Sequence, residues 1–400
     1  MIPLLNEKVK SIPEALSISI NQIVYDKKSK GEKVFTYSLG EAFFDIPFFG
    51  IDQNSFKVGY HYSNSMGQES LRKKIANLYK KQYGAEVNFS NEILISAGSK
   101  VIIYMLLDLV LCLGDQVLVP EPAWLSYKEH IKLLGGVHVP IPYNKKICDW
   151  EEYITNKTKV LIINNPNNPS GQLYSKAELE FLLKLAQKHN FFILSDEAYS
   201  DFLTHDKKFI SLASLDKTKE NSLIVNSLSK NMGMSGWRVG YTIAHSQIIK
   251  QLLKLNQHLI TCAPTILQDY MAKNFDQILS YTLPQARVIA EKRLKVQHIL
   301  DSLDIKSLNG VGTFYFLLNV SDFKGSTEEL VYELLLNHNI AVVPGVAYGE
   351  STKNFIRFGI GVENLEDIEN SLRVIKSYLS LPAYDSERLY QRLSVMGVNL

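Results

Sequence analysis

Lysine, hydroxyl and arginine side chains that could do chemistry together lie in the segment 227–240. It begins Ser-Leu-Ser-Lys, which places Ser227 and Ser229 just before Lys230, and Arg238 follows in the same segment. A partly desolvated lysine amine can lose its proton and attack a carbonyl, and hydroxyls beside an arginine are suited to hold a phosphate. The segment therefore predicts a site for an aldehyde that carries a phosphate, which describes pyridoxal phosphate.

The same short pattern also occurs in exposed loops, because most lysines are exposed. The interpretation therefore depends on the elements around Lys230. The apolar run 223–225 is typical of a buried strand, so the lysine would emerge at the carboxyl end of that strand. In open α/β sheets, ligands bind at this edge.

Two other predicted strands also end in polar residues. The run 160–163 is followed by Asn-Asn-Pro-Asn-Asn-Pro-Ser-Gly at 164–171, and the run 191–194 by Ser-Asp-Glu-Ala-Tyr at 195–199. Because parallel strands end at the same edge of a sheet, an acid, a phenol, an amide and the lysine are expected to meet in one pocket.

Strand-like runs alternate with helical patterns over much of the chain, which predicts a mainly parallel sheet covered by helices on both faces. After about residue 283 the pattern changes to a smaller α/β unit, with a long helix over 285–303 and a closing helix over 365–379. The expected strands are 93–95, 116–119, 137–141, 160–163, 191–194, 223–225 and 239–244, and the expected helices between them are 68–83, 125–134, 176–189 and 247–255. The expected divisions are an N-terminal segment (1–45) that packs with the small domain, a large domain (46–283), a small domain (284–381) and a C-terminal extension (382–400).

Bulk properties exclude several classes of protein. The 400 residues carry a net charge of +2, without the basic excess of nucleic-acid binders, so we expect small-molecule ligands or copies of the chain as partners, with no nucleic acid and no membrane. The three cysteines, Cys112, Cys148 and Cys262, are far apart, which favours reduced thiols over disulfides or a zinc site, and we expect no metal. The first residues lack the basic start and long apolar core that are typical of a secretory signal, and the apolar run 101–113 is too short for a membrane span, so a cytoplasmic location is expected.

Four motifs together resemble the fold-type I, pyridoxal-phosphate-dependent aminotransferases of class I/II. They are Asn-Asn-Pro-Ser-Gly at 167–171, Asp-Glu-Ala-Tyr at 196–199, the segment 227–240, and Phe-Ile-Arg-Phe-Gly at 355–359. They occur in the order of the family and span most of the chain. The resemblance implies a seven-stranded sheet and pyridoxal 5'-phosphate as cofactor.

The resemblance also implies catalytic roles. Lys230 would form the Schiff base with the cofactor and move a proton as general base and acid. Asp196 would pair with the pyridinium nitrogen of the cofactor. Tyr199 and Asn168 would hydrogen-bond the phenolic oxygen of the cofactor, and Asn168 would also lie beside the substrate.

The remaining roles concern binding. Trp124 would stack on the cofactor ring, Arg357 would bind the α-carboxylate of the substrate as a bidentate fork, and Gly40 would approach that carboxylate through its backbone. The phosphate group would be held by Ser227, Ser229, Arg238, the amides of Gly98 and Ser99, and Tyr62 from the other subunit of a homodimer.

The implied reaction moves an amino group between an L-amino acid and a 2-oxo acid by a ping-pong mechanism. A lyase or synthase of the same fold, such as a carbon–sulfur β-lyase or a cyclising enzyme, stays open as an alternative because it uses the same cofactor. An acyl enzyme that uses Ser-x-x-Lys is disfavoured, since its Ser-Asp-Asn and Lys-Thr-Gly elements are missing from the sequence.

The chain departs from the family in residues that bear on the substrate. Some aspartate-specific members carry a lysine at the position of Ser99, and the adjacent Lys100 is expected to point elsewhere on its helix. Glu121 and the aromatic run 43–49 favour a neutral or aromatic substrate.

Overall fold

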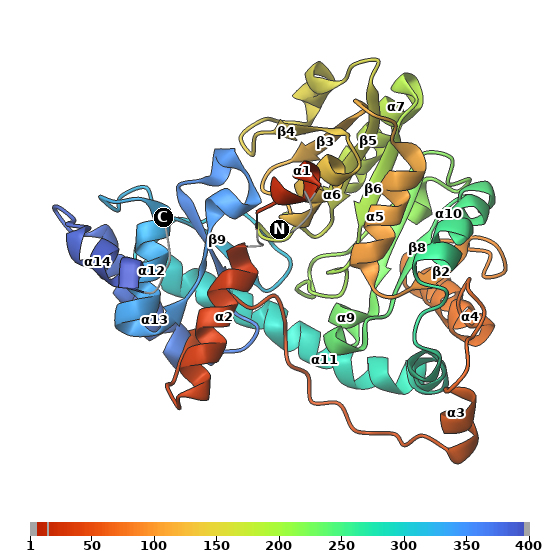
Figure 1. Cartoon of the computed structure of the whole chain (residues 1–400), viewed down its shortest axis with the longest axis horizontal. Coiled ribbons are helices and arrows are strands. Elements are labelled where there is room, and N and C mark those ends of the chain that lie inside the picture. The colour runs from red at the N-terminus through yellow and green to blue at the C-terminus, as the bar shows by residue number, and fades with distance from the viewer. Residues whose placement is uncertain (1–5, 14–15, 396–400) are drawn as a thin grey trace, which may run out of the picture.

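The computed structural model describes residues 6–13 and 16–395, which form two lobes joined by a long helix (Figure 1). The larger lobe contains a seven-stranded sheet with the order β2-β8-β7-β6-β5-β3-β4. β8 alone runs in the direction opposite to the other six strands, so the predicted mainly parallel sheet is confirmed. The strands are β2 (Ile93–Ser96), β3 (Gln116–Pro120), β4 (Val137–Ile141), β5 (Thr158–Asn164), β6 (Phe192–Asp196), β7 (Ser222–Ser227) and β8 (Gly240–Ile243).

Helices cover both faces of this sheet, which explains why its strands are continuous apolar runs. Along β5, Val160 and Ile162 pack into one core while Leu161 and Ile163 pack into the core on the opposite face. One core includes α5 (Ser99–Val110), α6 (Ser126–Leu133) and α10 (Ser246–Leu259), and the other includes α4 (Glu69–Leu78), α7 (Lys176–His189) and α8 (Leu212–Leu215). A π-helix at Tyr79–Tyr83 continues α4.

The long helix α11 (Thr265–Ser302) belongs to both lobes. Met271 and Phe275 pack in a core of the large lobe, whereas Ala286 and Val296 pack in the core of the small lobe. The predicted helix 285–303 is therefore the second part of a longer element, which continues through Pro284. The expected division at 283/284 falls inside α11 and stays a prediction.

The small lobe is built on a three-stranded antiparallel sheet with the order β11-β12-β9. The later part of the N-terminal segment joins this lobe, because β1 (Phe35–Thr36) pairs with β10 (Ile340–Ala341) and α2 (Leu16–Ser29) packs on β10 and β11. Its first helix, α1 (Glu7–Lys10), packs instead on α6 of the large lobe. The other strands and helices of the lobe are β9 (Tyr315–Asn319), β11 (Val343–Pro344), β12 (Phe355–Gly359), α12 (Thr327–His338) and α13 (Leu365–Leu379). The 3₁₀ segments Gly345–Tyr348 and Glu350–Thr352 lie between β11 and β12. Shorter helices outside the small lobe are α1 (Glu7–Lys10), α3 (Gln53–Val58), α9 (Leu228–Asn231) and the 3₁₀ segments Ile147–Tyr153 and Ser235–Trp237.

The C-terminal extension forms the helix α14 (Glu387–Val395), which packs on α12. Leu389 and Leu393 are buried against Tyr332, and Arg392 donates a hydrogen bond to the carbonyl of Leu336 at 3.2 Å. The spacing of Leu389, Leu393 and Met396 in the sequence predicts that they share one helical face, and Met396 lies outside the described residues. Across the described part of the chain, no helix is long and apolar enough to cross a membrane.

Candidate active site

Lys230 lies where the sheet meets the small lobe. Strand β7 ends at Ser227, whose Oγ accepts the backbone N–H of Ser229 at 3.1 Å and so begins the short helix α9 that carries Lys230. The lysine lines a cavity of about 390 Å³ between the lobes. Burial lowers the pKa of Lys230 to about 8, against the opposing effect of the Glu41 carboxylate. Near neutral pH, part of the Lys230 amine is therefore uncharged and can attack a carbonyl.

The acid of the site comes from the end of β6. Asp196 is buried, and its carboxylate accepts hydrogen bonds from Tyr127 Oη at 2.7 Å and from the N–H of Ala198 at 3.2 Å. Burial raises the pKa of Asp196, and these hydrogen bonds oppose that rise. Asn164, at the end of β5, connects this strand to the end of β6. Its side chain donates a hydrogen bond to the carbonyl of Asp196 and accepts the N–H of Asn168.

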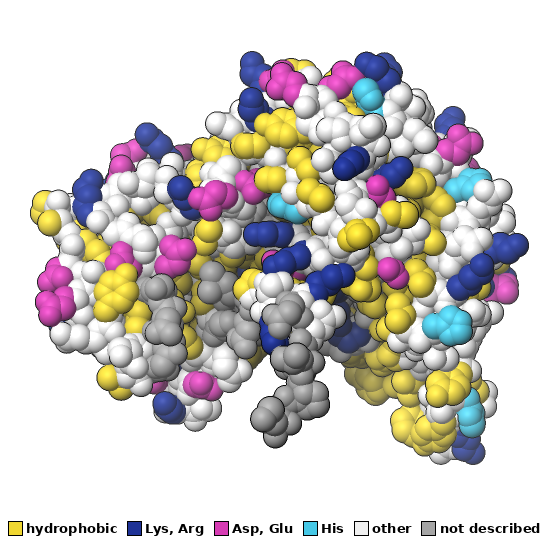
Figure 2. Space-filling view, turned by 45° about the horizontal axis from the view of Figure 1, so that its top comes forward, with side chains coloured by type: hydrophobic (Ala, Val, Ile, Leu, Met, Phe, Trp, Pro, Cys, Tyr) yellow, Lys and Arg dark blue, Asp and Glu magenta, His cyan; other side chains and the backbone are white. Residues whose placement is uncertain are grey.

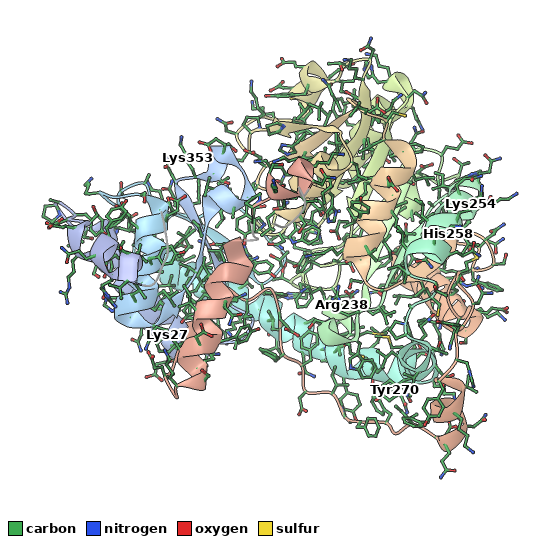
Figure 3. All side chains as sticks on the ribbon, viewed as in Figure 1. Lys27, Arg238, Lys254, His258, Tyr270 and Lys353 are labelled. Carbon is green, nitrogen blue, oxygen red and sulfur yellow. The ribbon has the colours of Figure 1, made fainter. Side chains whose placement is uncertain are left out.

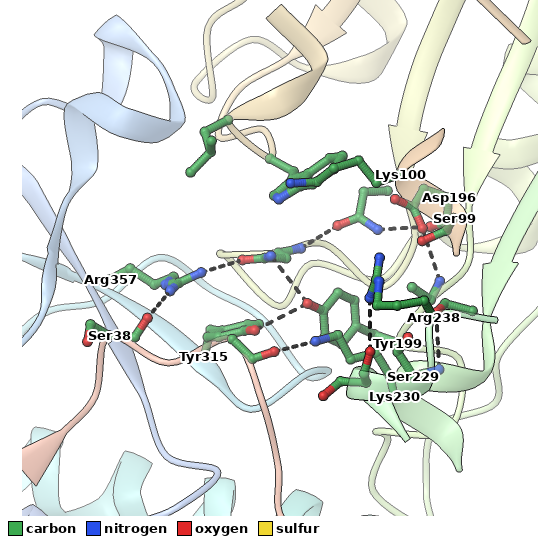
Figure 4. A pocket seen from close by; sticks show the side chains of 18 of the residues that line it. Ser38, Ser99, Lys100, Asp196, Tyr199, Ser229, Lys230, Arg238, Tyr315 and Arg357 are labelled. Carbon is green, nitrogen blue, oxygen red and sulfur yellow. Dashed lines mark hydrogen bonds between the residues drawn. The ribbon is translucent and has the colours of Figure 1, made fainter. Parts of the chain in front are cut away.

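Three polar side chains meet on the side of the cavity that faces the small lobe (Figure 4). Asn168 donates a hydrogen bond to Tyr199 Oη at 3.3 Å, and the hydroxyls of Tyr199 and Tyr315 lie 3.2 Å apart. Burial raises the pKa of Tyr199 well above its ordinary value, so its hydroxyl keeps its proton and can donate a hydrogen bond to an oxygen in the cavity.

Three hydroxyls and a guanidinium, a set of donors suited to a phosphate, line the same cavity: Ser99, Ser227, Ser229 and Arg238. Arg238 has a φ of 55°, in the left-handed region that such residues rarely adopt, and its guanidinium donates to the carbonyl of Ser235 at 2.9 Å. Gly98 has a φ of +93°, and a Cβ there would lie 2.7 Å from Arg238 Nη2. Only glycine therefore lets the start of α5 approach this arginine. Figure 3 shows Arg238 near the middle of the molecule.

Arg357 reaches the cavity from β12 in the small lobe. It is 4% exposed, donates to the carbonyl of Ser38 at 2.5 Å and to Asn168 Oδ1 at 3.5 Å, and its Nε has no hydrogen-bond partner among the described residues. Its guanidinium lies between the rings of Tyr315 and Tyr348, 4.6 and 5.2 Å from their centroids. No carboxylate of the described residues forms an ion pair with it. A buried arginine without a carboxylate partner is suited to bind a carboxylate ligand.

Trp124 and Lys100 contact each other on the lining of the cavity. Both line the cavity, and Lys100 Nζ is 5.1 Å from the centroid of the indole ring. The expectation that Lys100 points away from the site is therefore wrong. Helix α5 begins at Ser99, so Lys100 lies in the first turn, where a long side chain can lean over the helix start into the cavity.

The structure brings most of the predicted site residues to this cavity. Gly98 lies just behind the wall, against Arg238, rather than on the lining. Tyr62 is 85% exposed and does not line the cavity of its own chain. The predicted residues on the lining are Gly40, Ser99, Trp124, Asn168, Asp196, Tyr199, Ser227, Ser229, Lys230, Arg238 and Arg357.

Sequence reasoning missed several residues of the site, most importantly Tyr127 and Tyr315. Tyr127 lies one helical turn after Trp124, and this spacing could have drawn attention to it. Tyr315 lies in an apolar strand with no polar neighbour to mark it. Glu121, which was weighed for the substrate, instead accepts the N–H groups of Glu350 and Ser351 at 3.2 and 2.9 Å, and it does not line this cavity.

A family model described as "Aminotransferase class I and II" matches residues 50–375. The chain belongs to this aminotransferase family. An aspartate aminotransferase of Bacillus sp. strain YM-2 is 32% identical, with 94% of this chain and 100% of that protein covered. A (5-formylfuran-3-yl)methyl phosphate transaminase of Methanocaldococcus jannaschii is also 32% identical, with 88% and 93% covered. The solved structure of the Thermus thermophilus aspartate aminotransferase with maleate matches at a TM-score of 0.83 and 25% identity, with 95% and 99% covered.

The protein is thus a pyridoxal-phosphate-dependent aminotransferase with the fold of that family. The residues of its cavity fit the cofactor. An amine, a buried carboxylate, and hydroxyl and guanidinium donors that could hold a phosphate line a single cavity, and Gly98 allows the start of α5 to approach Arg238 closely.

Proposed function

We propose that this aminotransferase moves an amino group between an L-amino acid and a 2-oxo acid in two half-reactions, with the cofactor covalently attached to Lys230. The observation that carries the proposal is that Lys230, Asp196 and the unpaired Arg357 line the same cavity. They provide an amine that can lose its proton, an acid for the cofactor ring and a partner for the α-carboxylate of the substrate.

Different side chains of the cavity would bind different groups of the cofactor. Ser227, Ser229 and Arg238 would hold the phosphate, and Asp196, oriented by Tyr127, would bind the ring nitrogen. The bound ring supplies an electron sink for the α-carbon of the substrate. Lys230 would carry the proton to and from the reacting carbon, because its amine is released once the substrate is bound and its pKa of about 8 suits both directions of transfer.

The position of Lys100 supports a dicarboxylic amino donor. Lys100 and Arg357 lie on the same lining, and no carboxylate of the described residues forms an ion pair with Lys100. Two cations in one cavity can bind the two carboxylates of an aspartate-like substrate. The names of the relatives differ in substrate, so this assignment rests mainly on Lys100.

A homodimer with shared active sites forms part of the proposal. Tyr62 can serve as a phosphate ligand only if a second copy brings it to the cavity, because it lies outside the cavity of its own chain. The segment 43–62, which contains Tyr62, carries exposed aromatic rings, and such rings are enriched at protein interfaces. These are Phe43, Phe48, Phe56, Tyr60 and Tyr62.

The visible spectrum of the purified protein tests the chemistry. A yellow band from the lysine-bound cofactor should bleach when an amino donor is added and return when a 2-oxo acid is added. A protein that takes up no cofactor would contradict the proposal. Release of pyruvate and ammonia without an oxo-acid acceptor would instead show the lyase alternative.

Steady-state rates with Lys100→Met test the substrate class. We expect kcat/KM for aspartate to fall about 10- to 100-fold, since a charge-assisted hydrogen bond is lost, while kcat/KM for alanine stays near that of the unchanged protein. Equal losses with both donors would contradict a role for Lys100 in binding the second carboxylate.

A further inference from the structure

The segment 37–42 connects the small lobe to the catalytic lysine. On the side of the small lobe, the N–H of Gly359 donates to the carbonyl of Tyr37 at 2.8 Å, and Arg357 donates to the carbonyl of Ser38 at 2.5 Å. These bonds attach the segment to β12, the strand that carries the proposed substrate arginine.

On its other side, the segment contacts Lys230 of α9 and Ser235 of the 3₁₀ segment that follows. Lys230 Nζ donates a hydrogen bond to the carbonyl of Gly40, and Ser235 Oγ donates one to Glu41 Oε1. The carbonyl of the same Ser235 accepts a hydrogen bond from Arg238 at 2.9 Å. The carboxylate of Glu41 is thus held by a residue that also contacts the proposed phosphate arginine.

The charges around Lys230 show why this carboxylate matters. The cavity lining carries four cations, Lys100, Lys230, Arg238 and Arg357, and a single carboxylate, Asp196. Glu41 is not on the lining, yet it is a second carboxylate whose charge acts on Lys230.

Charged groups of the described residues act on the Lys230 amine in both directions. Arg238 and Arg357 favour its neutral form, while Glu41 and Asp196 favour its protonated form, and the neutral ring of Tyr199 lies with its centroid 5.9 Å from Nζ. Of the two carboxylates, Glu41 has the larger effect. Asp196 is buried, accepts a hydrogen bond from Tyr127 and is the proposed partner of the cofactor ring. Removal of the Glu41 carboxylate therefore changes the charge near Lys230 while Asp196 keeps its contacts.

We propose that Glu41, which accepts a hydrogen bond from Ser235, is a positioning residue. Its negative charge offsets the positive charges around Lys230, and its hydrogen bond holds the segment 37–42 beside Lys230 and Ser235. This inference rests on the proposed function of Lys230. Because Glu41 favours the protonated nitrogen, its loss should move the protonation midpoint of that nitrogen to lower pH.

The test is a titration of the holoenzyme, with the visible band of the lysine-bound cofactor followed against pH. Glu41→Gln keeps the size of the side chain and removes its charge, and we expect the midpoint to fall by about 1 pH unit. Asp45→Asn is the matched control, because it removes the same charge from a residue that lies just after the segment 37–42. The Asp45 side chain is exposed and forms no ion pair or hydrogen bond among those of the described residues, so its midpoint should move little.

A second pair of variants tests the role of Ser235. Ser235→Ala removes the hydroxyl that holds Glu41, and its midpoint should move in the same direction as that of Glu41→Gln. Ser235→Thr keeps a hydroxyl and should restore the midpoint of the unchanged protein. If Glu41→Gln fails to fold, as judged by circular dichroism, the two Ser235 variants decide the question.

The outcomes separate this inference from the proposed function. A wild-type protein without a cofactor band would refute the attachment to Lys230 and, with it, this inference. A normal wild-type band with midpoints that coincide for Glu41→Gln and Asp45→Asn would overturn only the role of Glu41.

Discussion

At the scale of single residues, the function of the cavity depends on how each charged group is partnered. Lys230 donates to a carbonyl, Asp196 accepts from Tyr127, and Arg357 has no carboxylate partner among the described residues. A buried charge that lacks a counter-ion costs free energy, and such groups gather where a ligand supplies the missing partner. In the proposed function, Arg357, which has no carboxylate partner among the described residues, would therefore lie at the substrate end of the cavity.

Replacement of Lys230 by alanine separates cofactor binding from catalysis. The variant should still bind pyridoxal phosphate through Ser227, Ser229 and Arg238, but without a covalent bond. Turnover should fall at least about 10²- to 10⁴-fold, because the general base is lost. Borohydride trapping followed by mass spectrometry checks the bond, and retained turnover in the variant would refute the role of Lys230.

Tyr127 should act through Asp196. Tyr127→Phe removes the 2.7 Å hydrogen bond that favours the ionised carboxylate, so the pKa of Asp196 should rise further. We expect kcat to fall about tenfold or more, since a hydrogen bond to a charged group contributes about 1.5–3 kcal/mol. Tyr104→Phe, a tyrosine of α5 that does not line the cavity, serves as the control. Equal kcat values for the two variants would contradict this role.

The sequence predicted the residues whose chemistry is unusual for their position, such as the lysine and the acid that follow buried strands. It did not predict Tyr127 and Tyr315, because a tyrosine in an apolar setting has the same pattern as a core residue. It was wrong about Lys100 because the direction of a first-turn side chain depends on the residue at which the helix begins.

At the scale of elements, the sequence predicted a helix or strand correctly where nearby residues make the hydrogen bonds of its backbone groups. A capping box at Ser175 and Glu178 begins α7, which matches the predicted helix 176–189. The Ser175 side chain accepts the N–H of Glu178, and the Glu178 carboxylate accepts the N–H of Ser175. The alternation of strands and helices predicted the sheet for a similar reason, because strands buried on both faces must be apolar throughout.

Ser175→Ala should lower stability without affecting the site. The change removes one half of the capping box, which contributes about 1 kcal/mol. We expect the free energy of unfolding to fall by that amount in a urea titration, while kcat stays the same. A stability equal to that of the unchanged protein would show that the cap contributes nothing measurable to α7.

The extent of α11 could not be predicted, because it depends on contacts distant in the sequence. A proline usually ends or kinks a helix, yet α11 continues through Pro284 because the cores of the two lobes bury the turns on each side of it. The π-helix at Tyr79–Tyr83 is a second example, since no local signal distinguishes it from the α-helix before it.

At the scale of the whole molecule, the proposed dimer predicts that two inactive chains can restore each other. A complete site would combine Lys230 of one chain with Tyr62 of another. Lys230→Ala and Tyr62→Ala chains should therefore regain activity when they are unfolded and refolded together, because one site of the mixed dimer contains both residues. Activity no greater than the sum of the separately refolded variants would contradict a shared site.

The arrangement of charge has a consequence for the speed of encounter. The chain as a whole is nearly neutral, with a net charge of +2, yet the cavity between the lobes concentrates four cations against one carboxylate. On the face shown in Figure 2, Lys and Arg side chains gather along the boundary between the two lobes. Such a local field draws anions toward the opening by diffusion, so the association rate of a dianionic substrate should fall steeply as ionic strength rises, whereas that of a zwitterion should change little.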